Sequence, residues 1–331
     1  MEKRVLVTGG SGFIGSNFIR YLLKNEDISE EINLINIDKI TYAGRGRNIE
    51  HIGISSNPRY SFVRADICDE DSIRKIISDY KPEIIFNFAA ESHVDRSISD
   101  PETFERSNFL GACNLFNLAL EMNIERIVQV STDEVYGSIE KGSFSETSPL
   151  NPSSPYSSTK AAADLAGLSL FREGGLPIII TRSANNFGPY QFPEKILPLF
   201  ITNLLQDKKV PLMWSEENPG LNVRDWIYVE DNCRAIWHAG VHGNVGEIYN
   251  IPGENERTNW EMTQIILNNL GFDEEMIEKI PHRKSHDFRY SVDGAKLKDS
   301  GFVPSGVSLD QRVMETIDWY KKNRDWWVSL K

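Results

Sequence analysis

A phenol and an ammonium group, Tyr156 and Lys160, lie four residues apart. On a helix this spacing places both side chains on one face. A lysine beside a tyrosine lowers the pKa of the phenol, so Tyr156 would be a usable general base near neutral pH. Such a pair is also common on protein surfaces. Here a strand-like run ends at Ser131 and Thr132, and ligands bind at the carboxyl ends of strands in parallel sheets, so we favour a catalytic pair.

Two adjacent acids, Asp133 and Glu134, follow directly after Thr132. They could form a solvated acidic turn. If they face a cleft instead, repulsion between like charges and loss of water favour protonation of one of them. The segment would then hold an acid and a base side by side. A plain hydride-transfer enzyme does not need that combination, so these residues indicate chemistry beyond a redox step.

A glycine-rich turn lies between the first apolar run and a helical pattern. Gly10, Gly12 and Gly15 fit the pattern G-x-G-x-x-G, and Gly9, Gly12 and Gly15 fit the related G-x-x-G-x-x-G. Glycine allows a tight turn and lets the backbone approach a pyrophosphate, which the N–H groups at the helix start would bind. The context predicts a dinucleotide site. The residues expected there are Gly9, Gly12, Phe13, Ile14 and Gly15.

Asp38 ends the second predicted strand, where an acid that binds a ribose is expected. It could be a solvated turn residue, but the context favours ribose binding. An acid here favours NAD over NADP because a 2′-phosphate would meet like charge, although Lys39 and two nearby arginines weaken that preference. Asp66 and Ile67 follow the third strand and could hold an adenine edge, whereas Asp66 could also cap a helix.

A sheet is needed to bring these residues together, and the first half of the chain predicts one. Short apolar runs alternate with amphipathic stretches, which indicates βαβ units and a parallel sheet. Asp100 and Pro101 predict the start of a helix over Glu102–Met122. The strands are expected at Val5–Thr8, Ile32–Ile37, Tyr60–Arg64, Ile84–Phe88, Ile127–Ser131 and Ile178–Arg182.

Beyond residue 186, prolines divide the chain into shorter pieces with longer loops. We therefore expect an α/β fold with a Rossmann-type doubly wound parallel sheet in residues 1–186, to which some later segments return. A smaller C-terminal substrate lobe is expected in residues 187–331. Its helices are expected around Glu194–Gln206, Glu230–Val241, Asn259–Leu270 and Leu309–Asn323.

Composition limits the classes of function. Lys+Arg 36 against Asp+Glu 48 give a net charge of −12, so neither a nucleic acid nor a membrane is an expected partner. The 3 cysteines are far apart, which argues against disulfides and fits a reducing cytoplasm. No apolar run is long enough to span a bilayer, and no signal peptide is expected. His238 and His242 have a zinc-binding spacing but no evident third ligand, so no metal is expected.

Together, the motifs resemble those of the extended short-chain dehydrogenase/reductases. Within that group they resemble the nucleoside-diphosphate-sugar 4,6-dehydratases, most closely the enzymes that act on dTDP-glucose. The resemblance covers nearly the whole chain. The matching segments are residues 9–15, 38–44 (DKITYAG), 66–69 (DICD), 89–97 (AAESHVDRS), 131–137 (STDEVYG), 154–160 (SPYSSTK), 185–190 (NNFGPY), 193–195 (PEK), 224–226 (RDW) and 249–251 (YNI).

The resemblance implies a reaction and a role for each catalytic residue. Tyr156 would take the proton of the sugar C4 hydroxyl, assisted by Lys160, while Thr132 orients the sugar and tightly held NAD+ accepts the hydride. Glu134 would then remove the C5 proton, and Asp133 would protonate the departing C6 hydroxyl. Return of the hydride to C6 gives a 4-keto-6-deoxy sugar.

The resemblance also implies binding residues and a partner. Lys195 and Arg224 suit a diphosphate, although each cation could be a solvated surface charge. A homodimer is implied through Glu102–Met122 and the helix that carries Tyr156, with packing inside one chain as the alternative. Further cofactor contacts are implied for Lys39, Thr41, Asp66, Ile67, Ala89, Ala90, Ser92, Ser107 and Asn186. Substrate contacts are implied for Ser92, Thr132, Asn185, Lys195, Ile196, Pro211, Met213, Arg224, Asn250, His286 and Tyr290.

Departures from the family pattern fall at residues 45–47, 214–219 and 282–290. The two later departures fall near the expected nucleotide pocket; they leave the reaction type unchanged but put the nucleobase in doubt, so a UDP-, CDP- or GDP-hexose stays an alternative substrate. A sugar-nucleotide 4-epimerase is a further alternative, but it would have no use for Asp133 and Glu134. An NAD-sensing scaffold protein is the alternative outside the enzymes, and the intact acid/base set argues against it.

Overall fold

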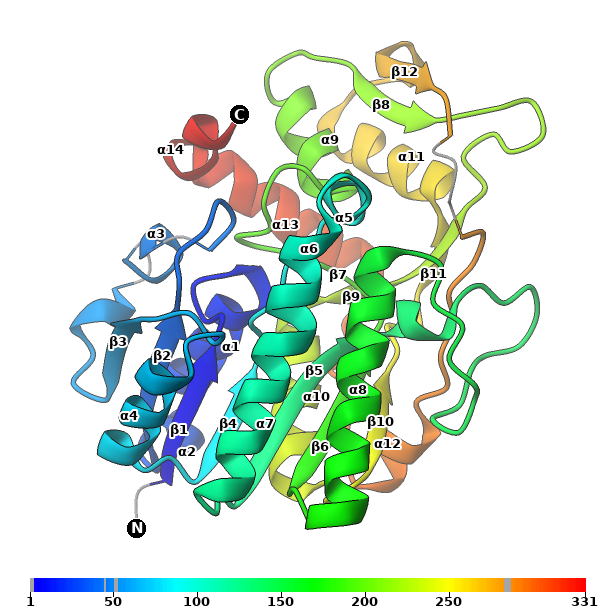
Figure 1. Ribbon diagram of the computed structural model, residues 1–331. Coiled ribbons are helices and arrows are strands. Elements are labelled where there is room, and N and C mark those ends of the chain that lie inside the picture. Colours follow the sequence, from blue (N-terminus) through cyan, green and yellow to red (C-terminus); the bar gives the residue numbers. More distant parts are fainter. Residues whose placement is uncertain (1–2, 45, 51–52, 283–286) are drawn as a thin grey trace.

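The computed structural model describes residues 3–44, 46–50, 53–282 and 287–331, and within them the centre is a 7-stranded sheet (Figure 1). The strand order is β10-β6-β5-β4-β1-β2-β3, and every neighbouring pair is parallel. The winding reverses between β1 and β4, and ligands bind beside such a reversal. The strands are β1 (Lys3–Thr8), β2 (Ile32–Asp38), β3 (Tyr60–Arg64), β4 (Ile84–Asn87), β5 (Arg126–Thr132), β6 (Ile178–Ser183) and β10 (Ile248–Ile251).

Helices cover both faces of this sheet. Val5 and Val7 of β1 belong to an apolar cluster with α1 and α10, whereas Leu6 belongs to a cluster with α4, α7 and α8. Because both faces are covered, most of the strands are continuous apolar runs, which is why the sequence predicted them, while the edge strand β3 is largely exposed. The helices of this part of the molecule, apart from α6, are α1 (Phe13–Lys24), α2 (Glu26–Ser29), α3 (Gly46–Glu50), α4 (Glu70–Tyr80), α5 (Val94–Ser99), α7 (Gly111–Glu121), α8 (Pro155–Gly174), α10 (Val229–His242) and α12 (Ala295–Asp299).

The helix expected over Glu102–Met122 is interrupted. It consists of α6 (Pro101–Phe104), a π-helical segment (Glu105–Leu110) and α7 (Gly111–Glu121). The start is as predicted, since Asp100 caps it and Pro101 takes its first position. The wider π turn carries Ser107 and Asn108, both buried, and such turns are common at functional sites. No local sequence signal marks this change of pitch.

The second half of the chain builds a separate apolar core above the sheet (Figure 1). A 3-stranded sheet and a 2-stranded sheet frame it in the described residues. β10 and α10 belong to the first half's sheet and its covering layer, so the chain returns there after residue 186. The elements of this part are β7 (Asn185–Phe187), α9 (Ile196–Leu204), β8 (Val210–Met213), β9 (Val223–Tyr228), β11 (Glu256–Thr258), α11 (Asn259–Leu270), β12 (Ile277–Ile280), α13 (Leu309–Lys322) and α14 (Arg324–Trp327).

Within the described residues, no helix combines the length and the apolar character needed to cross a membrane. Among the same residues, no group of three or more His, Cys, Asp or Glu side chains is placed to hold a metal ion. Cys68, Cys113 and Cys233 are all free thiols.

Candidate active site

The glycine turn after β1 is shaped for close approach of a ligand. Gly9 has a φ of 67°, and a Cβ there would lie 2.6 Å from the amide nitrogen of Ala89. The Gly12 amide donates to the Gly9 carbonyl at 3.1 Å, and Gly12 precedes the first residue of α1. Gly9, Gly12 and Gly15 line a pocket, whereas Gly10 packs against the Asn36 side chain. The motif is therefore used as G-x-x-G-x-x-G.

Asp38 joins this turn to the loop after β2. Its carboxylate accepts the amide of Ser11 at 3.0 Å and the amide of Ile40 at 2.8 Å. Burial raises the pKa of Asp38, while these two hydrogen bonds act in the opposite direction. The carboxylate lines the pocket, and each oxygen keeps acceptor capacity for a ligand hydroxyl.

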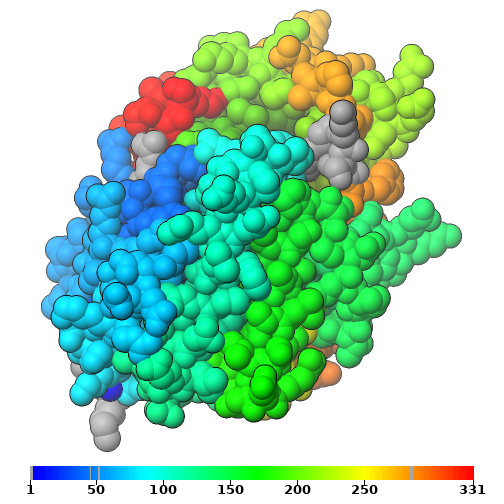
Figure 2. Space-filling view, viewed as in Figure 1, coloured from blue at the N-terminus to red at the C-terminus, as the bar shows by residue number. Residues whose placement is uncertain are grey.

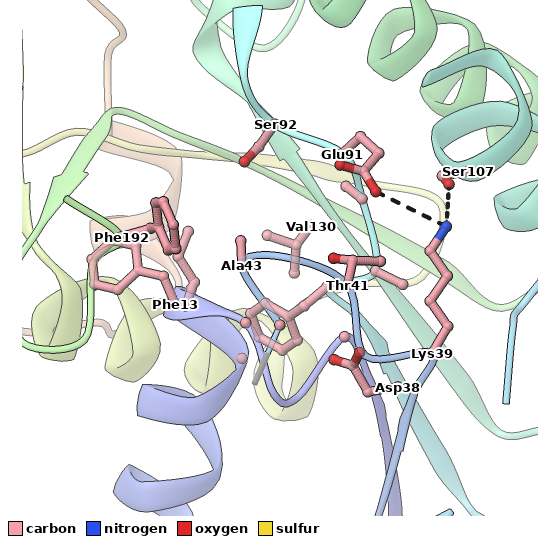
Figure 3. Close-up of a pocket in the computed structure, with 18 of the residues that line it drawn as sticks. Phe13, Asp38, Lys39, Thr41, Ala43, Glu91, Ser92, Ser107, Val130 and Phe192 are labelled. Atoms are coloured by element: carbon pink, nitrogen blue, oxygen red, sulfur yellow. Dashed lines mark hydrogen bonds and ion pairs between the residues drawn. The ribbon is translucent and has the colours of Figure 1, made fainter. Parts of the chain in front are cut away.

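The pocket runs along the carboxyl ends of β1, β2, β4 and β5 (Figure 3). Asn186 of β7 does not line it; its side chain donates to the Ala184 carbonyl at 3.0 Å and accepts from Asn232 at 2.8 Å. The structure therefore does not bring Asn186 to the expected cofactor residues. Those that do line the pocket are Gly9, Gly12, Phe13, Ile14, Gly15, Asp38, Lys39, Thr41, Asp66, Ile67, Ala89, Ala90, Ser92, Ser107, Tyr156 and Lys160.

Other residues line the pocket without having been singled out from the sequence. Lys39 donates to Ser107 at 2.9 Å and lies 4.0 Å from the carboxylate of Glu91, as Figure 3 shows. Tyr42 donates to Glu194 at 3.1 Å, so the loop after β2 meets the segment before α9. Tyr42 and Glu91 lie inside segments that match the family, so the sequence did contain a signal that could have identified them as pocket residues. Glu194 also stands inside a family motif, residues 193–195, but its contact with Tyr42 depends on long-range folding, for which the sequence had no signal.

Tyr156 and Lys160 lie in the first turns of α8. The helix begins with a capping box between Ser154 and Ser157 and with Pro155 at its first position. Tyr156 and Lys160 both line the pocket, as predicted from their spacing. The Lys160 ammonium donates to the carbonyl of Val130 at 2.6 Å.

The expected lowering of the Tyr156 pKa is not found. Burial raises the pKa of Tyr156, and the negative charge of Glu134 raises it further, while a hydrogen bond with Thr132 lowers it. Burial also lowers the pKa of Lys160 to about 8. Desolvation therefore outweighs the effect that the sequence predicted, because the phenol is enclosed beside an acid.

The acids after β5 form a short 3₁₀ turn over Asp133–Tyr136. The hydroxyl of Thr132 accepts the Glu134 amide and lies 3.3 Å from the Oδ1 atom of Asp133. Asp133 is 2% exposed, and its Oδ2 atom is buried with no hydrogen-bond partner among the described residues. Burial, followed by Glu134 and Asp225, raises the pKa of Asp133 well above its ordinary value. The raised pKa favours Asp133 as the acid of the pair that keeps its proton.

Arg224 of β9 is a buried cation beside these acids. It donates to the carbonyls of Val223 and Asp287 at 2.7 and 3.0 Å and lies 4.4 Å from the ring centre of Tyr290. The Tyr290 hydroxyl in turn donates to Asp287 at 2.6 Å. Arg224 and Tyr290 are therefore packed together, as expected of two residues of one binding site.

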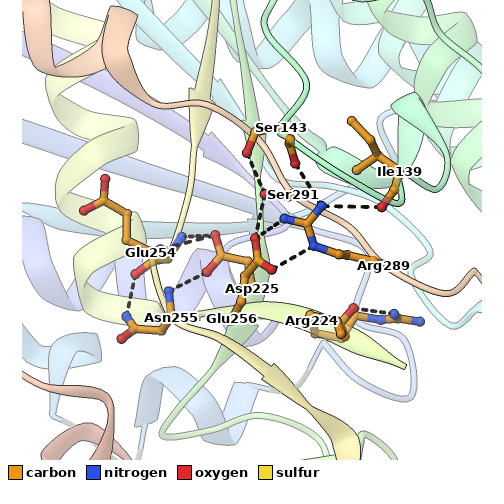
Figure 4. Close-up of polar contacts among 12 residues, drawn as sticks. Ile139, Ser143, Arg224, Asp225, Glu254, Asn255, Glu256, Arg289 and Ser291 are labelled. Atoms are coloured by element: carbon orange, nitrogen blue, oxygen red, sulfur yellow. Dashed lines mark hydrogen bonds and ion pairs between the residues drawn. The ribbon is translucent and has the colours of Figure 1, made fainter. Parts of the chain in front are cut away.

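Asp225, next to Arg224, fixes the position of β9 (Figure 4). Its carboxylate accepts the amides of Gly253 and Asn255, each at 2.7 Å, and the amide of Glu254 at 3.2 Å. Backbone hydrogen bonds of this number hold a carboxylate rigidly. The loop before β11 is therefore tied to the strand that carries Arg224.

The remaining expected substrate residues differ in their placement. Lys195 precedes α9 and donates to the carbonyl of Ser92 at 3.0 Å. Asn185 of β7 has a buried side-chain oxygen with no partner among the described residues. Ile196 begins α9, and Pro211 and Met213 are half-buried in β8. His286 lies outside the described residues.

Asn250, for which the resemblance implied a substrate contact, is hydrogen-bonded within the protein. It is fully buried, its side-chain oxygen accepts from the Tyr136 hydroxyl at 2.9 Å, and its amide donates to the Phe144 carbonyl at 3.1 Å. Both polar groups are thus engaged within the protein. Asn250 therefore helps to hold Tyr136 and Phe144, which follow β5, in place.

Comparison with known proteins agrees with this arrangement. A family model described as GDP-mannose 4,6 dehydratase matches residues 6–315. A dTDP-glucose 4,6-dehydratase from Streptomyces niveus is 43% identical over 330 residues, which are 99% of this chain and 96% of that protein. The structure of a dTDP-glucose 4,6-dehydratase from Streptomyces venezuelae with NAD bound has a TM-score of 0.94 and 44% identity, covering 99% of this chain and 100% of that one.

A UDP-glucose 4-epimerase from Thermus thermophilus, in complex with NAD, has a TM-score of 0.87 and 27% identity, covering 97% of this chain and 99% of that one. The fold and the NAD pocket are thus common to dehydratases and epimerases, whereas the higher identity is with the dehydratases. The chain belongs to the GDP-mannose 4,6 dehydratase family, within the extended short-chain dehydrogenase/reductases.

Proposed function

We propose that the protein is an NAD-dependent hydro-lyase that converts dTDP-glucose into dTDP-4-keto-6-deoxyglucose and water. The observation that carries this proposal is the buried carboxyl of Asp133, whose pKa is raised, next to Glu134 at the strand end that also faces Tyr156. Relatives that are 43% and 44% identical over nearly the full length act on dTDP-glucose, which supports the choice of nucleotide.

The pocket fits NAD. Gly9 leaves room where a side chain would meet Ala89, and the N–H groups at the start of α1 suit a pyrophosphate. Asp38 would accept the hydroxyls of a ribose, and its charge disfavours a 2′-phosphate. When bound, NAD supplies the acceptor for the hydride that leaves C4 and the donor of the hydride that returns to C6.

Tyr156 takes the proton of the C4 hydroxyl in this proposal. Its raised pKa has to be offset for that step, and the Lys160 ammonium, on the same helix face and in the same pocket, is the cation we assign to that role. Thr132 orients the same hydroxyl, since its side chain also interacts with Tyr156. The three residues therefore act as one proton-transfer unit.

Oxidation at C4 makes the C5 proton acidic, and Glu134 removes it, then returns a proton to C5 when the hydride reaches C6. Asp133 gives its proton to the C6 hydroxyl, which leaves as water. These roles need one ionised and one protonated carboxyl, and the deeper burial of Asp133 supports that division. Arg224 and Lys195 would neutralise the diphosphate, and β8 with Pro211 and Met213 would flank the nucleobase.

Turnover of a panel of sugar nucleotides tests this proposal. The purified protein is incubated with dTDP-, UDP-, CDP- and GDP-glucose, and the product is followed by the alkaline absorbance of a 4-keto-6-deoxy sugar. We expect this product from dTDP-glucose. Formation of the galactose epimer alone would indicate an epimerase, and no turnover of any sugar nucleotide would favour a scaffold protein.

We further propose that the protein is a cytoplasmic homodimer. The π-helical segment and α8 lie side by side on one face of the molecule (Figure 2). They expose Leu110 and Leu165, which are 57% and 55% accessible. Pairing of these faces in two copies would bury both leucines. The three free thiols support a reducing compartment.

A further inference from the structure

A buried acid lies one helical turn beyond the redox pair and has no part in the mechanism above. Asp164 follows Lys160 by four residues, just as Lys160 follows Tyr156, so the three side chains share one face of α8. Asp164 is 0% exposed and Lys160 is 3% exposed. A carboxylate at such a depth is unfavourable unless cations and hydrogen-bond donors surround it.

Asp164 has two such partners on neighbouring strands. Its Oδ2 atom accepts the Ser131 hydroxyl at 3.0 Å and lies 2.9 Å from the Nε atom of Arg182. Its Oδ1 atom is also buried but has no partner among the described residues. The Oδ2 atom is thus fixed by Ser131 and Arg182, whereas the Oδ1 atom is available for electrostatic interaction with Lys160.

The end of β5 connects Asp164 to Lys160. Lys160 donates to the carbonyl of Val130, and Asp164 accepts from the hydroxyl of the next residue, Ser131. Two consecutive residues of one strand therefore hold the two charged groups. This strand continues to Thr132 and the catalytic acids.

We propose that Asp164 is a positioning residue for the redox step, whose buried carboxylate keeps Lys160 charged and held against the end of β5. The proposal rests on the role given above to Tyr156 and Lys160. The negative charge of Asp164 is itself stabilised by Arg182, which lies 4.7 Å from the ring centre of Tyr136 and is almost fully buried. Lys160 is in this way supplied with a counter-charge that solvent cannot screen.

Asp164 of α8 acts electrostatically on Lys160. Asp133 and Glu134 after β5 act on Tyr156 of the same helix. Arg182 of β6 acts on Asp164. Burial lowers the pKa of Lys160 to about 8, and Asp164 opposes that effect. Removal of the Asp164 charge would therefore let Lys160 lose its proton at a lower pH.

The pH profile of dTDP-glucose turnover tests the proposal, with Asp164→Asn as the variant. We expect the alkaline fall in rate, where Lys160 loses its proton, to move to lower pH by about one unit or more. The rate of cofactor reduction in a single turnover, read from the absorbance of the reduced nicotinamide, should show the same shift. Asp164→Glu keeps the charge and should restore the position of the alkaline limb.

Glu173→Gln is the matched control, because Glu173 is an exposed carboxylate on the same helix. In Glu173→Gln, the alkaline fall in rate should occur at the same pH as in the natural protein. If Asp164→Asn alone does not fold because Arg182 loses its partner, Asp164→Asn combined with Arg182→Gln removes both charges and should show the same downward shift. An unmoved limb in whichever variant folds would overturn the proposal, whereas an inactive natural protein would instead overturn the proposed function.

Discussion

The carboxylate of Asp38 is joined to the backbone amide of Ser11, with 3.0 Å between the Oδ2 atom and the nitrogen. Ser11 lies within the glycine turn, and Asp38 ends the neighbouring strand β2. The acid that is placed to bind a ribose therefore also holds the turn that is placed to bind the pyrophosphate. A change at Asp38 affects both parts of the cofactor site.

Asp38→Asn should weaken NAD binding. The asparagine amide keeps one acceptor oxygen but loses the negative charge that accepts hydrogen bonds from the amides of Ser11 and Ile40 and would accept those of the ribose. We therefore expect the Kd for NAD to rise about tenfold or more. Calorimetric titration with NAD measures this. Asp71→Asn, at an exposed site on α4, is the control and should bind NAD normally. An unchanged Kd in Asp38→Asn would show that the acid is only structural.

Glu134→Gln should separate oxidation from elimination. The variant should still reduce its cofactor with dTDP-glucose, because Tyr156 and Lys160 are intact. It should lose exchange of the C5 proton with solvent, since the base for that proton is gone. Mass spectrometry of substrate recovered from D2O measures the exchange. Exchange at the natural rate would remove Glu134 from the assigned role.

Asp133→Asn should stabilise the protein while it stops the loss of water. The folded pKa of Asp133 is raised, so its ionisation opposes folding progressively as pH rises from its unfolded pKa through the folded one. The amide cannot ionise, and we expect the Tm at neutral pH to rise by about 2 °C or more. Thermal unfolding of the natural protein and the variant, at acidic and neutral pH, measures the difference.

The stability gain of Asp133→Asn should disappear at acidic pH, where Asp133 is protonated in both the folded and unfolded states. In the natural protein, the rate of elimination should fall as pH rises through the folded pKa of Asp133, because only the protonated acid can expel the C6 hydroxyl. A variant that is less stable at neutral pH would mean that Asp133 is ionised in the fold.

Leu165→Glu should convert a dimer into monomers. Leu165 is 55% exposed on α8, and a charge there would have to be buried between two copies. Light scattering coupled to size-exclusion chromatography gives the mass. Val303→Glu, at an exposed apolar residue outside this face, is the control and should keep the natural mass. A natural protein that is monomeric would refute the dimer directly.

Most of the strands could be predicted closely from sequence because they are buried on both faces, whereas the edge strand β3 is largely exposed and not buried as the sequence suggested. Tyr60–Arg64 was predicted with the observed bounds, and the other five runs differ by one or two residues at their ends. The helix Asn259–Leu270 was also predicted as observed, since Thr258 caps it and Gly271 ends it. Local signals were sufficient wherever a capping residue or a glycine marks the end of a helix.

Features that depend on distant parts of the chain could not be predicted in this way. The pKa of Tyr156 depends on burial and on Glu134, which the helical spacing of Tyr156 and Lys160 does not contain. The inward position of Asn250 depends on Tyr136, more than a hundred residues earlier. The bond between Tyr42 and Glu194 likewise joins two loops that only the finished fold brings together.

The return of β10 to the sheet has a consequence for how the chain acquires its structure. β10 pairs with β6, and α10 packs against α1, so the edge of the sheet and one side of the nucleotide-binding helix stay uncovered until residues near 251 have been made. A nascent chain that has passed β6 still exposes an unpaired strand edge and the apolar side of α1 to other chains. Synthesis therefore has to run through most of the polypeptide before the first βαβ unit is protected from aggregation.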